Sequence, residues 1–243
     1  MRFGIIGAGP IGANIAKKLV ENGHDVKIAD ARGLERLEGK NLTGTPVNVE
    51  DAIQDIDILI TSIPFYVLPS IRNIIDKVSE DVVVVDTSNY YPQLGGKIED
   101  VENGMVESVW VANQLGRPII KAFNNFLAYT LEHNGTPEGT DGRIAIAVAD
   151  EDLSHKQIIM GVANELGFDA VDSGSLRDSW RQQPGTPGYC TELTKDELAT
   201  ALTKANKEKA PILRDKVMEK LIASGFTLAH QDFVNVNREV FNS

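Results

Sequence analysis

A glycine-rich turn near the N-terminus constrains this chain more than any other feature of its sequence. The turn reads Gly7-Ala8-Gly9-Pro10-Ile11-Gly12 and lies between an apolar segment, residues 2–6, and an amphipathic segment, residues 10–21. This pattern, placed after a strand and opening a helix, is typical of a dinucleotide-binding βαβ unit. We therefore expect residues 7–12 to bind a pyrophosphate at the start of that helix.

The three glycines have separate physical roles. Gly7 permits the tight turn out of the strand, Gly9 lets the backbone approach the pyrophosphate, and Gly12 lets the helix pack close to the strand. Pro10 suits the first helical turn, where a backbone N–H has no partner within the helix. A glycine-rich turn that binds no nucleotide is the alternative, but the regular succession of strand, helix and second strand favours dinucleotide binding.

The choice of dinucleotide depends on the residues after the second expected strand, Asp30-Ala31-Arg32. Asp30 follows the first glycine at about the ~20-residue spacing of the acidic residue that bonds the ribose diol of NAD. Arg32 favours NADP, because a guanidinium can pair with the 2′-phosphate. A carboxylate repels that phosphate unless it turns away. NADP is the expected cofactor, and NAD remains open.

Short β-branched segments alternate with longer amphipathic ones, which predicts an α/β protein: a Rossmann-like, doubly wound, mostly parallel sheet. Segments such as Val82–Val85 are apolar on both faces, as in a strand covered by helices on either side. The expected strands are residues 2–6, 25–29, 57–62, 82–86, 118–122, 143–149 and 168–172. The expected helices are residues 10–21, 65–78, 105–115 and 153–166.

The character of the chain changes after Gly174, where a Pro/Gly-rich segment precedes a lysine- and glutamate-rich one. We expect residues 1–180 to form the NAD(P)-binding Rossmann domain and residues 181–243 a C-terminal loop and helical appendage. Thr194 and Glu197 predict a capping box. Pro211 is expected to end that helix and to start the next one. The second helix has one apolar face, which suggests a homodimer. Its apolar positions are Ile212, Leu213, Val217, Leu221 and Ile222.

Composition excludes several classes of function. The 243 residues carry a formal net charge of −11, which argues against nucleic-acid binding. No apolar stretch approaches the ~18 residues that a membrane span requires. A single cysteine and four scattered histidines form neither a disulfide nor a metal-ligand pattern. Cytoplasmic location, with no metal, no membrane and no nucleic acid as partner, is the expectation.

Later segments, taken with the turn, resemble the coenzyme F-420-dependent NADP oxidoreductase family. The same positions are similar to the cytoplasmic reductase domain of STEAP-type metalloreductases. The likeness covers about residues 1–180. The segments that carry it are residues 2–12, Ala29-Asp30-Ala31-Arg32-Gly33, Ser62-Ile63-Pro64-Phe65, Asp86-Thr87-Ser88-Asn89, Ile120-Lys121-Ala122-Phe123-Asn124 and residues 167–174.

The resemblance implies further cofactor-binding residues. Ile63, Pro64 and Phe65 would flank the bridge between adenosine and nicotinamide, Asn89 would lie at the next strand end, and Ala122-Phe123-Asn124 would border the nicotinamide. Ligands of open parallel sheets collect outside the carboxyl ends of the strands, which agrees with this placement. The implied reaction is hydride transfer between NADP(H) and a small redox acceptor, a flavin or a deazaflavin.

The chain departs from the family at two points. Relatives usually carry Asn-Ser-Arg where this chain has Asp30-Ala31-Arg32, so a serine hydroxyl for the 2′-phosphate is missing. Coenzyme F-420 is itself polyanionic, and a net charge of −11 repels it at long range.

No catalytic side chain is expected, because the cofactors supply the reactivity. His133 and His155 have no identifiable partners, Lys121 is expected to snorkel from an apolar strand, and Cys190 to be an inert packed thiol. Two other functions stay open. One is a small carbonyl or imine dehydrogenase. The other is a non-catalytic NADP(H)-binding sensor or a module that supports a partner.

Overall fold

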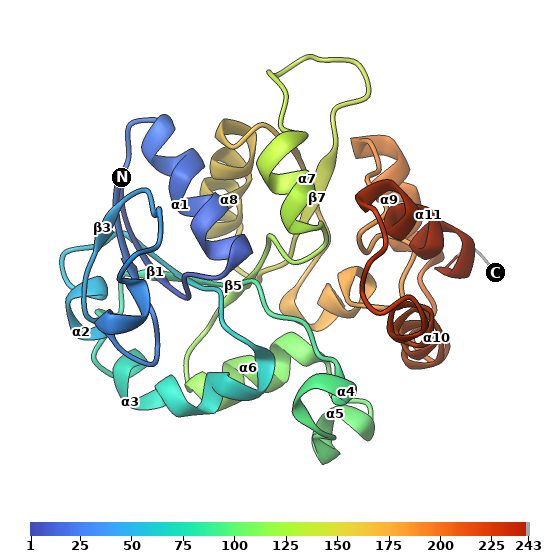
Figure 1. Cartoon of the computed structure of the whole chain (residues 1–243), viewed down its shortest axis with the longest axis horizontal. Helices are drawn as coiled ribbons and strands as arrows, with labels where there is room; N and C mark the ends of the chain where they lie inside the picture. The colour runs from blue at the N-terminus through green and yellow to red at the C-terminus, as the bar shows by residue number, and fades with distance from the viewer. Residues whose placement is uncertain (242–243) are drawn as a thin grey trace.

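The computed structural model describes residues 1–241, and its centre is a parallel six-stranded sheet (Figure 1). The strand order is β3-β2-β1-β4-β5-β6. The order reverses between β1 and β4, the place where ligands bind in open α/β sheets. The expected Rossmann-like sheet is thus confirmed. Its strands are β1 (Arg2–Ile6), β2 (Asp25–Ala29), β3 (Thr45–Pro46), β4 (Ile58–Thr61), β5 (Val83–Asp86) and β6 (Ile120–Lys121).

Helices cover both faces of the sheet, with α1, α7 and α8 on one face and α3 and α6 on the other (Figure 1). The α-helices of this part are α1 (Pro10–Glu21), α2 (Val49–Ala52), α3 (Arg72–Ile75), α4 (Pro92–Gly95), α5 (Glu99–Glu102), α6 (Glu107–Leu115), α7 (Ala128–His133) and α8 (Leu153–Glu165). The 3₁₀ helices are η1 (Leu34–Leu37), η2 (Phe65–Ile71) and η3 (Leu176–Gln182).

The two faces have separate hydrophobic cores. One core joins α1 and α8 to the sheet, with Ile15, Leu19 and Ile159 among its members. The other joins η2 and α6 to the opposite face, with Leu68 and Trp110 among its members. Every residue of β4 and β5 is buried, as their uninterrupted apolar sequences predict.

Three expected elements differ in the structure. The helix expected over residues 65–78 is a 3₁₀ helix followed by one short α-helical turn, because Pro69 removes a backbone donor within it. The last two expected strands, β7 (Ala145–Val148) and β8 (Asp169–Asp172), form their own parallel pair. Only an antiparallel bridge between Lys121 and Ala149 joins that pair to β6.

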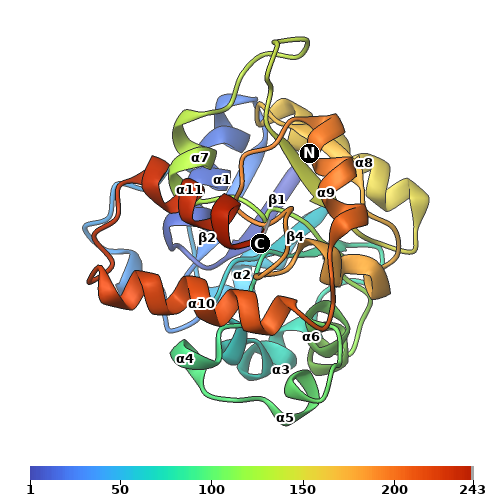
Figure 2. The ribbon, with the colours of Figure 1, turned by 90° about the vertical axis from the view of Figure 1, so that its right-hand side faces the viewer.

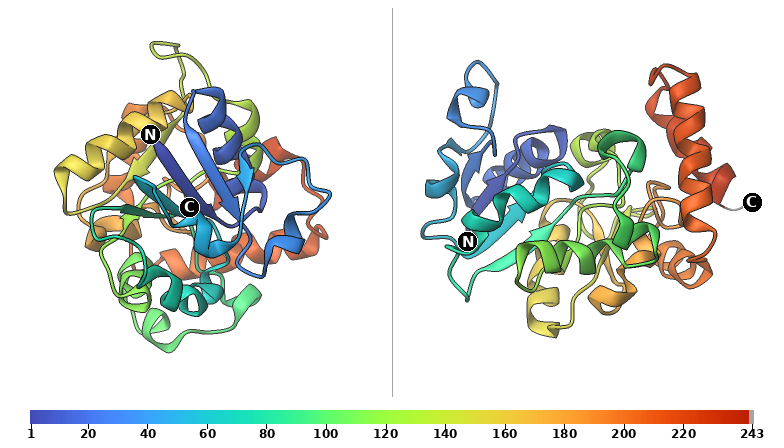
Figure 3. Two further views of the ribbon diagram at one scale, coloured as in Figure 1. Left: turned by 90° about the vertical axis from the view of Figure 1, so that its left-hand side faces the viewer. Right: turned by 90° about the horizontal axis from the view of Figure 1, so that it is seen from below.

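The C-terminal region packs across the carboxyl ends of the strands. It contains α9 (Lys195–Lys204), α10 (Ala210–Ala223) and α11 (His230–Phe241). Figure 2 shows these helices in front of the sheet, and Figure 3 shows α10 and α11 at the opposite end of the molecule from the N-terminus. Leu213 and Val217 of α10 belong to a cluster that includes Tyr91 and Leu127, from the loops after β5 and β6.

The capping box that opens α9 is present, with Glu197 accepting from the backbone and hydroxyl of Thr194. The helix ends at Lys204, however, so Pro211 does not end it and instead lies in the first turn of α10. Sequence reasoning also missed α11. The division at residue 180 stays a prediction.

The apolar face expected on α10 is used partly within the chain. Leu213 and Val217 are buried, whereas Ile212 and Ile222 are 59% and 54% exposed. The homodimer therefore stays a prediction, and light scattering on the purified protein tests it. Among the helices of residues 1–241, none combines the length and the apolarity that crossing a bilayer demands.

Candidate functional site

The turn between β1 and α1 is held by backbone contacts that exclude larger residues. Gly7 has a φ of +119°, and its N–H donates to the Ala29 carbonyl at 2.8 Å. A Cβ on Gly7 would lie 2.1 Å from the Ser62 carbonyl oxygen, and one on Gly12 would lie 2.0 Å from the Gly7 carbonyl oxygen. These two glycines therefore set the close approach of β1, α1 and the loop after β4.

Gly9 has a different environment, because a Cβ at this position would meet nothing within 4 Å. It is the N-cap of α1, where no side chain caps the helix and no acidic residue stands in the first turn. The free N–H groups and the positive helix end therefore face open space beside Gly9 and Pro10. Ala8 is buried and Ile11 half-buried. The residues of this turn fit the pyrophosphate of a dinucleotide.

Asp30 and Arg32 form an ion pair at the end of β2. The guanidinium donates from Nε and Nη2 to the two carboxylate oxygens, each at 3.0 Å, and the Arg32 N–H donates to Oδ1 at 3.0 Å. These bonds lower the pKa of Asp30. The carboxylate is buried, whereas the Arg32 side chain is 65% exposed. The ion pair weakens the repulsion between Asp30 and a 2′-phosphate, and the exposed guanidinium retains N–H groups that can donate to one.

The three residues expected after β4 point in different directions. The side chains of Ile63 and Phe65 are buried, and the Phe65 ring stacks on Trp110 with centroids 4.7 Å apart. Only Pro64 exposes its side chain. A cofactor can therefore meet Pro64 directly, but Ile63 and Phe65 only through their backbone.

Three amide side chains form one hydrogen-bonded group, the amide cluster: Asn89, Asn124 and Gln182. Asn89 and Asn124 are joined twice, from Asn124 Nδ2 to Asn89 Oδ1 at 3.0 Å and from Asn89 Nδ2 to the Asn124 carbonyl at 3.1 Å. Gln182 Nε2 donates to Asn124 Oδ1 at 2.9 Å and to the Ala147 carbonyl at 3.0 Å. Gln182 and Asn124 are almost fully buried. The structure thus brings together Asn89, which the resemblance placed at a strand end, and Asn124, which it placed beside the nicotinamide.

Gln182 is a residue that sequence reasoning missed as part of this site. It lies in η3, and its Oε1 accepts from the Ser173 hydroxyl. No local pattern could reveal that its amide fills the space between Asn124 and Ala147.

The other two residues expected beside the nicotinamide are buried. Ala122 is 0% and Phe123 is 1% exposed, so a cofactor would reach them only through the backbone. Phe123 has a φ of +57°, which is uncommon for a non-glycine residue. This conformation sends its ring toward Phe126 in the core. It also leaves the next residue, Asn124, to face Asn89 and Gln182.

Lys121 does not snorkel to the surface, as expected from the sequence, because it finds a carboxylate inside the protein. Its Nζ donates to Asp86 at 2.6 Å and to the Ser88 carbonyl, and both charged side chains are almost completely buried. A buried charge requires such a partner. The pair holds the loop after β5 against β6, which positions Asn89.

Glu107 is a second buried carboxyl close to this loop. It accepts from the Tyr90 N–H at 3.1 Å. Burial raises the pKa of Glu107 to about 7, and the nearby charge of Lys121 acts in the opposite direction. The group therefore titrates near neutral pH, beneath the loop that carries Asn89.

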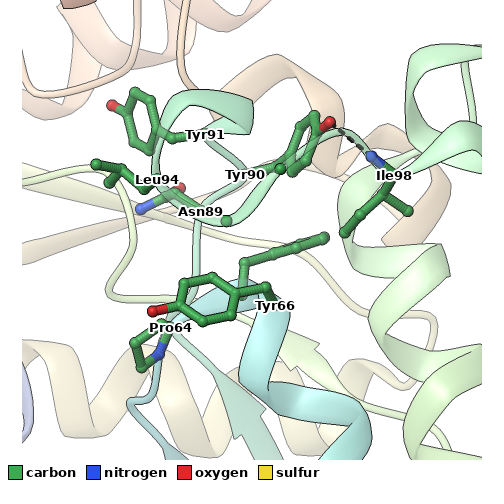
Figure 4. Close-up of a pocket in the computed structure, with 10 residues that line it drawn as sticks. Pro64, Tyr66, Asn89, Tyr90, Tyr91, Leu94 and Ile98 are labelled. Carbon is green, nitrogen blue, oxygen red and sulfur yellow. Dashed lines mark hydrogen bonds between the residues drawn. The ribbon is translucent and has the colours of Figure 1, made fainter.

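A small cavity of about 70 Å³, the aromatic pocket, lies beside the amide cluster (Figure 4). Its lining includes Tyr66, Asn89, Tyr90, Tyr91, Leu94 and Ile98. Pro64 and Tyr66 face Leu94 and Tyr91 across it. The pocket lies between η2 and the loop after β5, so it shares Pro64, Phe65 and Asn89 with the predicted cofactor site.

The remaining candidate side chains lie elsewhere. His133 is exposed and His155 is half-buried, and each has one carboxylate near its ring, Glu132 at 3.6 Å and Asp152 at 3.9 Å. Cys190 is buried, and burial raises the pKa of its thiol, which makes it unreactive. Within residues 1–241 no three His, Cys, Asp or Glu side chains are grouped to hold a metal ion.

Comparisons with known proteins agree with this geometry. Residues 2–90, which span β1 to the loop after β5, match the model of the family described as NADP oxidoreductase, coenzyme F420-dependent. Protein YjhV of Escherichia coli (strain K12) is 36% identical over 110 residues, which cover 45% of this chain and 80% of YjhV.

Solved structures share the architecture. The hypothetical protein SMa0349 from Sinorhizobium meliloti is 27% identical, with a TM-score of 0.67 over 81% of this chain and 96% of that one. A candidate F420-dependent NADP-reductase from Arthrobacter sp. FB24 has the same fold at 16% identity, with a TM-score of 0.57 over 72% of this chain and 86% of that one.

The family match thus covers the glycine turn, the Asp30–Arg32 pair, Pro64 and Asn89, which are the residues that the geometry selects on its own. The chain belongs to the coenzyme F420-dependent NADP oxidoreductase family and is an NADP-dependent oxidoreductase.

Proposed function

We propose that this oxidoreductase transfers a hydride directly between NADP(H) and a flat flavin- or deazaflavin-type ring. NADPH, when bound, supplies the hydride. The open turn at Gly9 would hold the pyrophosphate, and Arg32 would pair with the 2′-phosphate. Asn89 and Asn124 would position the nicotinamide end, because Gln182 holds the Asn124 amide, which in turn bonds to Asn89.

One observation carries the proposal: Asn89 and Asn124 bring no titratable proton donor to the predicted nicotinamide site, and the titratable groups near them, Lys121 and Glu107, are buried. Asn89 and Asn124 do not titrate, and Lys121 is buried and paired with Asp86. Reduction of a carbonyl or an imine benefits from a positioned acid, whereas hydride transfer between two rings needs mainly position and exclusion of water. This set of residues therefore favours a ring as the acceptor.

The test is to mix the purified protein with NADPH and one acceptor at a time and to follow the absorbance of the reduced nicotinamide. We expect oxidation with riboflavin or with a deazaflavin. Oxidation only with aliphatic carbonyls or imines would contradict the proposal and favour a dehydrogenase. Tight NADPH binding without oxidation by any acceptor would favour a sensor or a partner-supporting module.

A further inference from the structure

We propose that the aromatic pocket binds the electron acceptor, and that it selects a flat ring without charge. The inference rests on the proposed NADPH-dependent reduction and adds both the place of the acceptor and its chemical class. Four properties of the pocket carry it: its size, its exposed apolar walls, its lack of charged groups and its contact with the amide cluster.

The size of the pocket fits the edge of a ring system. Its volume is about 70 Å³. A closed cavity that holds one benzene measures about 150 Å³. A three-ring acceptor therefore cannot enter completely, and only one edge of it fits among Pro64, Tyr91 and Leu94 (Figure 4). The rest of the ring system remains outside the pocket.

The walls at the pocket mouth are apolar and exposed. Leu94 is 61% and Tyr66 is 51% exposed, although both are large apolar side chains. The Tyr66 ring lies against Gly95, where a Cβ would approach its Cδ1 to 2.3 Å. The glycine thus lets the ring lie flat against the loop. A planar ligand placed here would remove both side chains from water, which is favourable in proportion to the apolar area buried.

Two of the three tyrosines that line the pocket have hydroxyl groups bonded within the protein. The Tyr90 hydroxyl donates to Glu102 at 2.9 Å and accepts from the Ile98 N–H at 3.0 Å. The Tyr91 hydroxyl donates to Tyr189 at 3.1 Å. Both hydroxyls are therefore occupied within the protein. A ligand can stack on the exposed ring of Tyr66 and on the half-buried ring of Tyr91. Tyr90 is only 2% exposed, and Arg214 lies over its ring at 5.2 Å from the centroid.

No Lys, Arg, His, Asp or Glu is among the residues that line the pocket. An ionised group inside it would lose its hydration without gaining a partner. The net charge of −11 adds long-range repulsion of an anionic ligand. An uncharged ring, such as riboflavin or a neutral quinone, therefore fits this pocket better than the polyanionic coenzyme F-420.

Asn89 connects the pocket to the predicted nicotinamide site, because it lines the pocket and also bonds to Asn124. A ring in the pocket would thus lie beside the reduced nicotinamide. The reaction balances without a further reagent: NADPH gives a hydride to the ring, the ring takes one proton from solvent, and NADP⁺ and the two-electron-reduced ring are the products.

The decisive variant is Leu94→Asp, which places a charge at the pocket mouth, and Leu153→Asp is its matched control. Leu153 is 67% exposed at the start of α8, far along the chain from the site. Two measurements are made on the full chain: quenching of riboflavin fluorescence on binding, and the KM values for riboflavin and for menadione, a neutral quinone, at saturating NADPH. Calorimetry gives the NADPH affinity separately.

We expect Leu94→Asp to weaken riboflavin binding and to raise both KM values about tenfold or more, with NADPH affinity unchanged. Leu153→Asp should match the wild type. Wild-type protein should bind riboflavin more tightly than coenzyme F-420.

Three results would overturn the inference. The first is an unchanged KM and riboflavin affinity in Leu94→Asp. The second is an equal loss of NADPH affinity in that variant, which would mean that the pocket holds the nicotinamide itself. The third is tighter binding of coenzyme F-420 than of riboflavin. Failure of the proposed function has a different signature, which is riboflavin binding that depends on Leu94 without any oxidation of NADPH.

Discussion

The turn between β1 and α1 and the amide cluster beside β6 lie at the same edge of the sheet, but the chain builds them in different ways. The turn uses residues 7–12 and works through backbone groups and the absence of side chains. The amide cluster joins Asn89, Asn124 and Gln182, and its hydrogen bond from Gln182 to Asn124 links residues 58 positions apart in the sequence. The first region is a local backbone site, and the second is an assembly of side chains that only the complete fold brings together.

This difference teaches which changes each region can tolerate. We expect the turn to lose pyrophosphate binding when a side chain fills the space beside Gly9, even if the fold is intact. We expect the amide cluster to lose its arrangement when one hydrogen bond is removed, because the buried polar partner is then unsatisfied. Four predictions test this comparison, beginning with the largest expected effect.

Gly9→Val should abolish NADPH binding, with at least about a 100-fold loss of affinity, or about 2.7 kcal/mol. The added side chain would fill the space in front of the helix N-terminus. The fold should survive, because Gly9 has an extended backbone, with φ −80° and ψ −179°, and a Cβ there meets no protein atom. Calorimetric titration measures the affinity, and circular dichroism checks the fold.

The matched control is Gly161→Val, because a Cβ at Gly161 also meets nothing within 4 Å but lies on α8. This variant should bind NADPH normally. Retained NADPH binding in Gly9→Val would mean that the pyrophosphate does not bind at this turn, and the turn would then not be a local backbone site.

Gln182→Leu should weaken NADPH binding by about tenfold and leave the affinity for 2′,5′-ADP, which lacks the nicotinamide, unchanged. It should also lower the free energy of unfolding by about 1–3 kcal/mol, because Asn124, Ala147 and Ser173 lose a buried hydrogen-bond partner. Titration with both ligands and urea unfolding measure these effects.

Gln231→Leu, an exposed site on α11, serves as the control and should change neither affinity. Equal losses for NADPH and 2′,5′-ADP would mean that Gln182 supports the whole protein rather than the nicotinamide end.

Arg32→Ala should reduce NADPH affinity about tenfold and NADH affinity much less, because only NADPH carries a 2′-phosphate for the guanidinium to bind. Arg36→Ala, an exposed arginine in η1, is the control and should behave as the wild type. Equal losses for the two dinucleotides would assign Arg32 the purely structural role of neutralising Asp30.

Glu107→Gln should change the pH dependence of stability and leave NADPH affinity close to that of the wild type. The carboxyl has a pKa of about 7 when folded, against an ordinary value of 4.5. Its contribution to stability is therefore complete below about pH 4.5 and is lost as pH rises to about 7. The loss is on the order of 3 kcal/mol.

Urea unfolding of the wild type between pH 4 and pH 8 should show this decline, and Glu107→Gln should lack it. Glu99→Gln, at an exposed position of α5, should retain it. A decline of the same size in all three proteins would locate its origin in other groups.

The sequence predicted the secondary structure around the turn of residues 7–12 almost completely, because neighbouring residues determine it. The bounds of β1, α1 and β2 agree with the expected ones, Gly7 and Gly12 make the expected close contacts, and the space at Gly9 is open. The sequence marked Asp30 and Arg32 as the residues near the ribose. It did not predict the ion pair between them, which depends on the path of the backbone after β2.

The second region could be predicted only in part. Family resemblance selected Asn89 and Asn124, but neither Gln182 nor the partner of Lys121 leaves a sequence signal. Both contacts depend on tertiary packing between strands and on η3. The same limit explains Phe65 and Phe123, whose residue types are compatible with a ligand contact but whose side chains are buried in the core.

The position of Gln182 in the chain sets when the amide cluster can form during protein synthesis. A ribosome releases the N-terminus first, so the strand, turn and helix around Gly9 emerge early. The residue that braces Asn124 emerges more than a hundred residues later, and the helices that pack on Tyr91 and Leu127 follow it. On the function proposed above, we therefore expect a growing chain to form its pyrophosphate site long before its nicotinamide site is complete.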